Sequence, residues 1–313
     1  MRSFVIGGAG FIGSHLVDRL ALRGHVTVYD NLSIGRQTLV ARHLDAGRAS
    51  LVVADALDLD KLREAMAGHD VVFHLAANPE ARWGLERTRL DLEQGTIVTY
   101  NALEAARLTG IHDFVFSSSG TVYGNTTNAC AEMNLGHLPI SLYGASKLAG
   151  EALVASYAEC FGVRGFIARF GNVVGARATH GAILDFCKKL KATPDRLDVL
   201  GNGTQSKPYI HVTDCVAAIL HVYDHAREEN PAIYNLGPRD WTTVRFIAEA
   251  CVKHSPNPNA MIVYGESAQG WPGDVPTSRL DPTKLEQLGF RLRYTSNEAL
   301  ELAVGEVAAE TFR

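Results

Sequence analysis

A glycine-rich loop close to the N-terminus constrains the fold more than any other feature. Gly7, Gly10 and Gly13 follow the apolar run SFVI and precede a helical pattern over about 11–23. Glycines at this spacing allow a tight turn, bring the backbone close to a pyrophosphate, and let helix and strand pack closely. The start of the helix adds free N–H groups and a partial positive charge. The sequence therefore predicts a strand–loop–helix unit that binds a dinucleotide.

Short apolar runs alternate with helical patterns through the first half of the chain. Strands that are apolar nearly throughout and separated by helices indicate a parallel sheet covered on both faces. We predict an α/β fold, with a Rossmann-type doubly wound parallel sheet and a smaller α/β substrate-binding C-terminal region. The expected strands span 3–6, 25–30, 51–55, 71–77, 113–119 and 165–170, with helices near 11–23, 58–67, 91–108 and after Tyr143.

Glycine and proline become more frequent after residue 170, and no repeat or long linker separates the two regions. We expect a dinucleotide-binding Rossmann domain over 1–170, which also includes about 209–237, and a mainly substrate-binding region over 171–313. The second region is expected to carry helices near 181–191, 213–226, 243–253, 281–288 and 296–309.

Composition excludes several classes of function. The net charge is −4, so there is no basic excess that would attract nucleic acid or anionic lipid. No apolar run reaches the roughly 18 residues that a membrane-spanning helix needs, and the N-terminus lacks the pattern of a signal peptide. The five cysteines are far apart and include no C-x-x-C, which favours reduced thiols and argues against a metal site. We expect a cytoplasmic protein with neither a nucleic-acid nor a membrane partner.

The second predicted strand ends in Tyr29-Asp30-Asn31. A carboxylate about 20 residues beyond the glycine loop accepts hydrogen bonds from an adenosine ribose and repels a 2′-phosphate, which favours NAD over NADP. Arg36 lies close by in sequence and could accommodate a phosphate, and a strand-end aspartate can also cap a turn. Asp55, at the end of the third predicted strand, is placed to meet the adenine, although a loop role fits this residue nearly as well.

Tyr143 and Lys147 are the only tyrosine and lysine at i and i+4 among the ten tyrosines. This spacing puts both side chains on one face of the predicted helix. An ammonium beside the phenol, and the positive charge of an oxidised nicotinamide, favour loss of the phenol proton. Ser117, Ser118 and Ser119 end the fifth predicted strand, at the edge where such sheets bind ligands. We infer that Tyr143 acts as a base assisted by Lys147, with a serine hydroxyl beside it. The alternative is a solvated helix start.

Six segments in this order resemble the extended short-chain dehydrogenase/reductase family: GGAGFIG, YDNLS, FHLAANPEAR, FSSSGTVYG, YGASK and RFGNVVG. Within this family the chain resembles, almost end to end, nucleotide-sugar C4-epimerases of the UDP-glucose (UDP-galactose) 4-epimerase type. HLAANPEAR, HGAILDF, GNGTQSKPYIHV and GWPGDV are most similar to the archaeal-type branch. The resemblance implies a tightly held NAD, a transient 4-keto sugar and no net redox change. Tyr143 would take the proton of the 4-hydroxyl, while hydride leaves C4 and returns to the other face.

The resemblance also implies roles for individual residues. Ser119 would bind O4 with Thr121 as a helper, Lys147 would hold the nicotinamide ribose, and Asn172 would bind the substrate diphosphate. The catalytic residues are then Tyr143, Lys147, Ser119 and Thr121. The cofactor-binding residues are Gly7, Gly10, Phe11, Ile12, Gly13, Asp30, Asn31, Ser33, Gly35, Asp55, Ala56, Leu75, Ala76, Ala77, Ser117, Tyr143 and Lys147. The substrate-binding residues are Arg82, Asn172, Ile183, Lys207, Tyr209, Trp271, Asp274 and Ser278.

Several positions depart from the family pattern. Gly95 stands where an asparagine often lies near the cofactor. Lys207 and Trp271 stand where two arginines usually clamp the substrate diphosphate, and neither offers a bidentate fork. Ser278 stands where a bulky tyrosine restricts the pocket, so either there is room for an N-acetylated sugar or the Trp271 loop shifts this position away. Other basic residues must share the phosphates, and the candidates are Arg82, Arg177 and Arg279.

The expected activity is C4 epimerisation of a UDP-hexose, namely UDP-glucose and UDP-galactose, with N-acetylated forms left open. UDP-glucuronate 4-epimerase is one alternative, because Arg82 and Arg177 could bind a carboxylate. A 4,6-dehydratase commonly carries Asp-Glu before V-Y-G, where this chain has Gly120 and Thr121, which argues against dehydration. A non-enzymatic NAD-binding regulator usually loses the tyrosine or the lysine, and this chain keeps both. Helices near 91–108 and 144–161 form a four-helix dimer interface in this family, so we expect a homodimer.

Overall fold

The computed structural model describes all residues from 1 to 313, which form two compact units. Unit 1 comprises Met1–Ser119, Leu142–Arg169 and Ile219–Tyr234. Unit 2 comprises Gly120–Ser141, Phe170–Ala218 and Asn235–Arg313. The chain thus passes between the units several times, whereas the sequence suggests a boundary near residue 170 and one return of the chain to the first domain over about 209–237. No helix combines the length and the apolar character needed to cross a membrane.

A seven-stranded sheet forms the centre of unit 1, with the strand order β11-β6-β5-β4-β1-β2-β3. Neighbouring strands run parallel where β1 meets β2 and β4, where β2 meets β3, and where β4 meets β5. The strand order reverses at β1 and β4, and ligands bind at the carboxyl ends of the strands at such a point. The predicted α/β fold with a doubly wound sheet is therefore confirmed. The strands are β1 (Ser3–Ile6), β2 (Val26–Asp30), β3 (Ala49–Val53), β4 (Val71–His74), β5 (Asp113–Ser119), β6 (Arg164–Phe170) and β11 (Ala232–Leu236).

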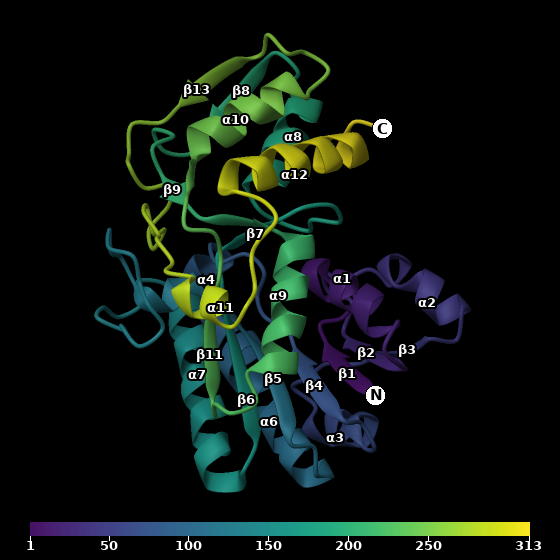
Figure 1. Cartoon of the computed structure of the whole chain (residues 1–313). Coiled ribbons are helices and arrows are strands. Elements are labelled where there is room, and N and C mark those ends of the chain that lie inside the picture. Colours follow the sequence, from purple (N-terminus) through teal and green to yellow (C-terminus); the bar gives the residue numbers. More distant parts are fainter. The chain divides into compact units, whose positions relative to one another are not determined.

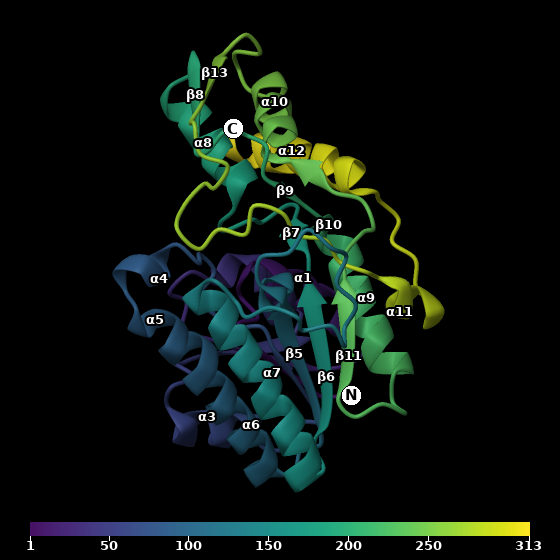
Figure 2. The same cartoon turned by 90° about the vertical axis from the view of Figure 1, so that its left-hand side faces the viewer.

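Helices cover the sheet because the strands are apolar on both faces. α3 (Leu59–Met66), α6 (Val98–Thr109) and α7 (Leu142–Phe161) share one hydrophobic core with the sheet, which includes Phe114 and Phe116 of β5. Figure 2 shows these three helices side by side on one face, with α1 (Phe11–Leu20) behind the sheet.

Shorter helices occupy the connections. η1 (Gln37–Leu39) and α2 (Ala41–Asp45) follow β2, and α4 (Trp83–Glu86), α5 (Arg89–Asp91) and the π-helix η2 (Leu92–Ile97) lead into α6. The sequence predicts one continuous helix over 91–108, but the structure has a π-helical stretch with wider turns before α6 begins. The strand predicted over 71–77 ends at His74, because the next residues form the turn beside the glycine loop.

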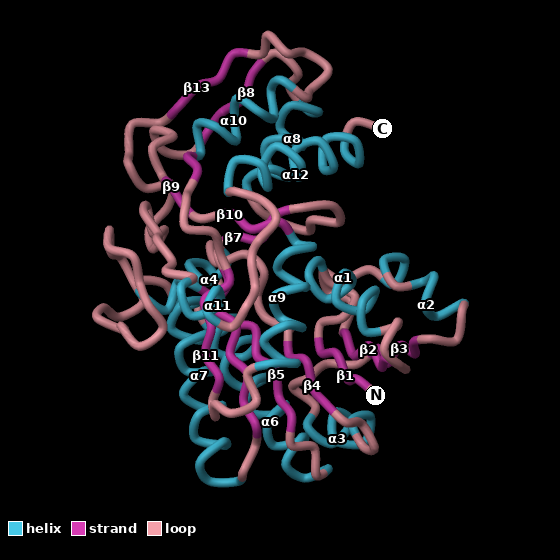
Figure 3. Tube along the Cα trace, viewed as in Figure 1, coloured by secondary structure: helices cyan, strands magenta, loops and turns pink.

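Unit 2 is built around a core of three helices, α8 (Ala182–Ala192), α10 (Val244–Lys253) and α12 (Ser296–Thr311), which lie close together in Figure 1. Thr295 and Glu298 form a capping box that begins α12. Three two-stranded sheets complete the unit: β7 (Asn172–Val174) with β10 (Tyr209–His211), β8 (Arg196–Val199) with β13 (Met261–Tyr264), and β9 (Ser206–Lys207) with β12 (Thr242–Thr243). η3 (Gly120–Tyr123) and α11 (Thr283–Gln287) also belong to unit 2, and α9 (Val212–His225) begins there and ends in unit 1. Figure 3 shows the long loop that leads from η3 to α7.

Candidate active site

The glycine loop joins β1 to α1 and is shaped for close approach of the backbone. Gly7 has a φ of +80°, and a Cβ there would lie 2.7 Å from the amide nitrogen of Ala76 in the segment after β4. A Cβ on Gly13 would collide with the carbonyl oxygen of Gly7. α1 begins at Phe11 without a side-chain cap. The loop therefore offers a bare backbone at the start of a helix, which suits a pyrophosphate.

Asp30, at the carboxyl end of β2, is bound directly to the glycine loop. Its carboxylate accepts hydrogen bonds from the backbone N–H groups of Ala9 at 3.0 Å and Leu32 at 2.9 Å. Burial raises the pKa of Asp30, and these two N–H groups oppose that shift. A Cβ on Gly35 would lie 2.9 Å from both carboxylate oxygens, so the loop after β2 passes close to Asp30. The oxygens keep lone pairs that a ribose hydroxyl can use.

Asn31 and Asp55 meet beyond the ends of the neighbouring strands β2 and β3. Asn31 Nδ2 donates to Asp55 Oδ2 at 3.0 Å, and Asn31 Oδ1 accepts from the backbone N–H of Ser33 at 3.0 Å. Asn101 on α6, which sequence reasoning missed, donates to the carbonyl oxygen of Ala56 at 3.0 Å. The structure thus brings the residues predicted to bind the adenosine together at one edge of the sheet.

Tyr143 lies in the first turn of α7, beside the end of β5. Its side chain shares a hydrogen bond with that of Ser119, the last residue of β5. Burial raises the pKa of Tyr143 to about 12, with Ser119 opposing this shift and Asp91 adding to it. The phenol therefore stays protonated at neutral pH until a further positive charge favours the phenolate.

Lys147 lies one turn further along α7 and is only 3% exposed. Its Nζ donates to the carbonyl oxygen of Ser117 at 2.7 Å and lies 5.8 Å from the ring centre of Tyr143. Burial lowers the pKa of Lys147 to about 8, while Asp91 and Glu151 act in the opposite direction. The predicted tyrosine–lysine pair and the serines of β5 are therefore neighbours in the structure.

Two buried side chains that the sequence does not single out lie near this pair. His74, the last residue of β4, contacts Thr99 Oγ1 through Nε2 at 3.0 Å. Burial, together with Lys147, lowers the pKa of His74 to about 3, so the imidazole is neutral. Asp91 lies at the end of α5 and is 1% exposed. No spacing marks either residue, because one ends an apolar strand and the other belongs to a charged run that is typical of a solvated helix.

Unit 2 carries most of the residues predicted to bind substrate. Lys207 Nζ forms an ion pair with Asp274 Oδ1 at 2.6 Å. Tyr209 on β10 and Asn172 on β7 share a side-chain hydrogen bond, and Asn172 is exposed. Ile183, by contrast, is 5% exposed and packs in the core formed by α8, α10 and α12, so its side chain has little surface to offer a ligand.

Ser278 and Trp271, which depart from the family pattern, both lie in unit 2. A Cβ on Gly120 would lie 3.7 Å from Ser278 Oγ, so Ser278 lies close to the start of η3, which also contains Thr121. The backbone carbonyl of Trp271 accepts from the N–H of Asp274 at 3.0 Å. The GWPGD segment is therefore a closed turn, with Trp271 at its start.

The candidate arginines Arg82 and Arg279 have side-chain partners within the protein. Arg82 in unit 1 binds Glu80 through Nε and Nη2, both at 3.0 Å. Arg279 in unit 2 donates to the Ser206 hydroxyl at 2.8 Å. Its guanidinium carbon lies 3.8 Å from the ring centre of Trp241. A phosphate would have to compete with these contacts.

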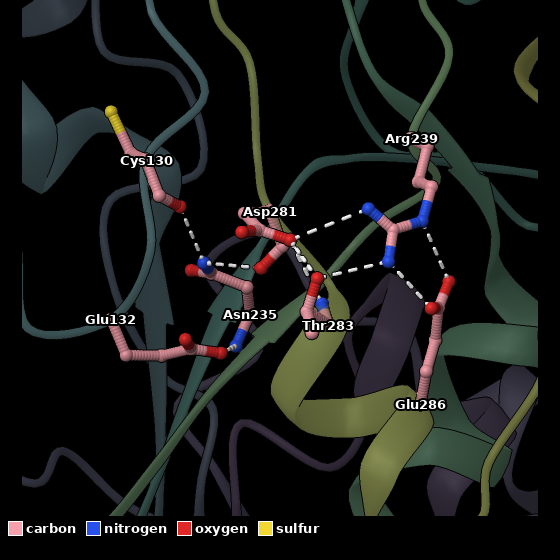
Figure 4. Close-up of polar contacts among 7 residues, drawn as sticks. All are labelled: Cys130, Glu132, Asn235, Arg239, Asp281, Thr283 and Glu286. Atoms are coloured by element: carbon pink, nitrogen blue, oxygen red, sulfur yellow. Dashed lines mark hydrogen bonds and ion pairs between the residues drawn. The ribbon is translucent and has the colours of Figure 1, made fainter.

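Asn235, on β11, ties together three segments of unit 2 (Figure 4). Its Nδ2 donates to the carbonyl oxygens of Cys130 at 2.8 Å and Asp281 at 3.0 Å, and its backbone N–H donates to Glu132 Oε1 at 2.9 Å. The hydroxyl of Tyr123 donates to Asn235 Oδ1 at 2.7 Å. This one side chain therefore fixes the segments that lead from Thr121 to the long loop and from Ser278 to α11.

Arg239 adds a second set of contacts beside Asn235 (Figure 4). It pairs with Glu286 at 2.6 Å and with Asp281 at 3.5 Å. Thr283 donates to Asp281 Oδ1 through its backbone N–H at 3.0 Å. The start of α11 is thus attached to the end of β11.

Asn235→Ala is expected to lower the free energy of unfolding by about 1–3 kcal/mol, because the buried partners of the amide lose their hydrogen bonds. Urea denaturation measures this change. The matched control is Asn259→Ala, since Asn259 is exposed and its loss should change stability by less than about 0.5 kcal/mol. Equal stability of the two variants would contradict this role of Asn235.

Comparisons with known proteins identify the family of this chain. The family described as "NAD dependent epimerase/dehydratase family" matches residues 3–237. The UDP-glucose 4-epimerase of Mycolicibacterium smegmatis is 30% identical over 97% of this chain and 97% of its own. The UDP-N-acetyl-alpha-D-glucosaminuronate decarboxylase of Bacillus cytotoxicus is 30% identical over 92% of this chain and 91% of its own. A crystal structure of a UDP-galactose 4-epimerase superposes with a TM-score of 0.87 at 40% identity, covering 99% of both chains.

Proposed function

The chain belongs to the NAD dependent epimerase/dehydratase family, and from this premise we propose that it is a nucleotide-sugar 4-epimerase acting on UDP-glucose and UDP-galactose. The observation that carries the proposal is the side-chain hydrogen bond between Tyr143 and Ser119, with the Lys147 ammonium next to the phenol. These groups suit removal of a proton from a sugar hydroxyl and its later return.

The residues of unit 1 fit the NAD on which this family depends. The glycine loop, together with Leu75, Ala76 and Ala77, would hold the pyrophosphate against bare backbone. Asp30 would accept hydrogen bonds from the adenosine ribose, and Lys147 would donate to the nicotinamide ribose. When bound, NAD would supply the acceptor and donor of the C4 hydride, so that the reaction needs no external oxidant.

Tyr143 handles the proton of the 4-hydroxyl. The Ser119 hydroxyl would lie beside the same oxygen, so that the proton has a short path to the phenolate. Because burial raises the pKa of Tyr143 to about 12, the cation of Lys147 and the positive charge of the bound cofactor must both favour the phenolate. Epimerisation requires that Tyr143 returns this proton to the same oxygen after the 4-keto sugar has turned its other face.

Residues of unit 2 are proposed to bind the nucleotide part of the substrate. Asn172 is exposed, and Lys207 supplies a cation whose charge is shared with Asp274. We propose that Asn172 and Lys207 contact the diphosphate, with Tyr209, Trp271 and Asp274 completing the contacts. Ser278 has a small side chain and lies close to Gly120, so we propose N-acetylated sugars as further substrates.

The proposal is tested by incubating the purified protein, without added cofactor, with UDP-galactose, UDP-N-acetylgalactosamine and UDP-glucuronate in separate reactions. NMR of the anomeric protons should show UDP-galactose converting to UDP-glucose. Faster turnover of UDP-glucuronate than of UDP-galactose would indicate a UDP-glucuronate 4-epimerase. Release of CO₂ from UDP-glucuronate would indicate a decarboxylase. If none of the three sugars changed, the proposed activity would be wrong for these substrates.

We also propose a homodimer in the cytoplasm. Leu92, Tyr100 and Leu108 of η2 and α6, and Phe161 of α7, are 44–51% exposed. Large apolar side chains at helical spacing on adjacent helices form a surface that a second copy could cover. The mass of the protein in solution tests this assembly state.

A further inference from the structure

The Lys147 ammonium occupies an unusual position for a charged group. It is 3% exposed, and its single hydrogen bond goes to the carbonyl oxygen of Ser117. The ring of Phe116 lies 5.1 Å away on another side. Burial disfavours the charged form of a lysine, so a nearby anion is needed if the ammonium is to persist at neutral pH.

Glu151, one turn further along α7, is not free to serve as that anion. Arg169 on β6 binds it with two hydrogen bonds, Nε to Oε1 at 2.8 Å and Nη2 to Oε2 at 2.6 Å. The hydroxyl of Ser118 donates to the same Oε1. Since Arg169 is itself 1% exposed, the two charges compensate each other within the protein.

Asp91 is the second carboxylate that raises the pKa of Lys147, and no cation is in direct contact with it. It is 1% exposed, its Oδ1 accepts from Asn78 Nδ2 at 3.0 Å, and its Oδ2 accepts no hydrogen bond from the protein. A Cβ on Gly84 would collide with Oδ2. The short helix α4 therefore closes over this oxygen instead of leaving it to solvent.

The backbone around Asp91 brings it towards α7. The π-helix η2 starts directly after Asp91, and such wide turns occur frequently at functional sites. A Cβ on Gly95 would collide with the Ser146 side chain, which precedes Lys147 in the chain. Glycine at this position, where the family pattern has asparagine, thus allows η2 to pack closely on the helix that carries the lysine.

We propose that Asp91 is the counter-ion of Lys147, a positioning residue that keeps the ammonium charged inside the protein. The other ionisable groups in this region do not supply an unpaired negative charge to Lys147. His74 on β4 is neutral, Tyr143 is protonated in the absence of other help, and Glu151 is paired with Arg169. Glu80 is paired with Arg82, and Glu93 with Arg89.

A double-mutant cycle with Lys147→Met tests the pairing without any measurement of activity. Asp91→Asn keeps the acceptor for Asn78 but removes the charge. In the wild-type background it should lower the free energy of unfolding at pH 7, because Lys147 loses its anion. In the Lys147→Met background it should raise that free energy, because it removes a buried carboxylate that has no cation. Destabilisation of the same size in both backgrounds would overturn the proposal.

The pH dependence supplies a second readout, which rests on the proposed function. Asp91 raises the pKa of Lys147, so its removal lowers the pH at which the ammonium is lost. The alkaline limb of the kcat profile should therefore move to lower pH in Asp91→Asn, by about one unit. Glu93→Gln, two residues further on, is the control and should leave the limb in place. A uniform loss of kcat with an unmoved limb would count against the counter-ion role. Inactivity of the wild type towards all the UDP-sugars would instead refute the proposed function, and the stability cycle would still decide on Asp91.

Discussion

Tyr143→Phe is expected to lower kcat for UDP-galactose by a factor of about 10²–10⁴, the usual contribution of a positioned acid–base group. The phenylalanine ring keeps the packing at the start of α7, where Lys147 Nζ lies 5.8 Å from the ring centre. It removes only the hydroxyl that Ser119 contacts. The variant should therefore fold and retain NAD, while the proton of the 4-hydroxyl has no acceptor. Turnover is followed by NMR, and the retained NAD is measured by its absorbance after the protein is denatured.

Tyr100→Phe is the matched control for Tyr143→Phe, because Tyr100 is 44% exposed on α6 and lacks a serine partner. It should turn over substrate at the wild-type rate. If Tyr143→Phe also kept the wild-type rate, Tyr143 would not be the base. If it lost both turnover and NAD, its main role would be to bind the cofactor.

Much of the fold follows from local sequence signals. The glycine loop, the alternation of apolar strands with helices, and the strand-end aspartate predict β1 to β6 and the helices between them, because each signal depends on neighbours in the sequence. β11 is different: its sequence AIYNL is short, follows Asn230-Pro231 and is followed by Gly237-Pro238. Its place at the edge of the sheet depends on pairing with β6, a contact between distant parts of the chain that no local pattern indicates.

The site divides in the same way. Tyr143 and Lys147 are predictable because i and i+4 on a helix guarantee a common face. Asp91, Glu151 and Asn235 are not, because their importance comes from burial. In the sequence Asp91 belongs to RTRLDLEQ, and only the tertiary packing of α4 and α7 shows that this carboxylate is withdrawn from water.

Arg169→Met is expected to lower the free energy of unfolding by about 3–5 kcal/mol, because it leaves the Glu151 carboxylate buried without its cation. Glu151 is 5% exposed, and the Ser118 hydroxyl alone cannot balance a full charge there. The double variant Arg169→Met/Glu151→Gln should recover at least half of the loss, since removing both charges of a buried pair is often close to neutral. Urea denaturation of the three proteins at pH 7 measures these differences.

Arg63→Met supplies the control for Arg169→Met, because Arg63 on α3 forms an ion pair with Asp60 in which both side chains are at least half exposed. Exposed pairs contribute little, so this change should cost less than about 1 kcal/mol. The two arginines differ in burial, while both form an ion pair with a carboxylate on a helix of unit 1. A loss of similar size in both variants would show that the Arg169–Glu151 pair is no more important to the fold than an ion pair in water.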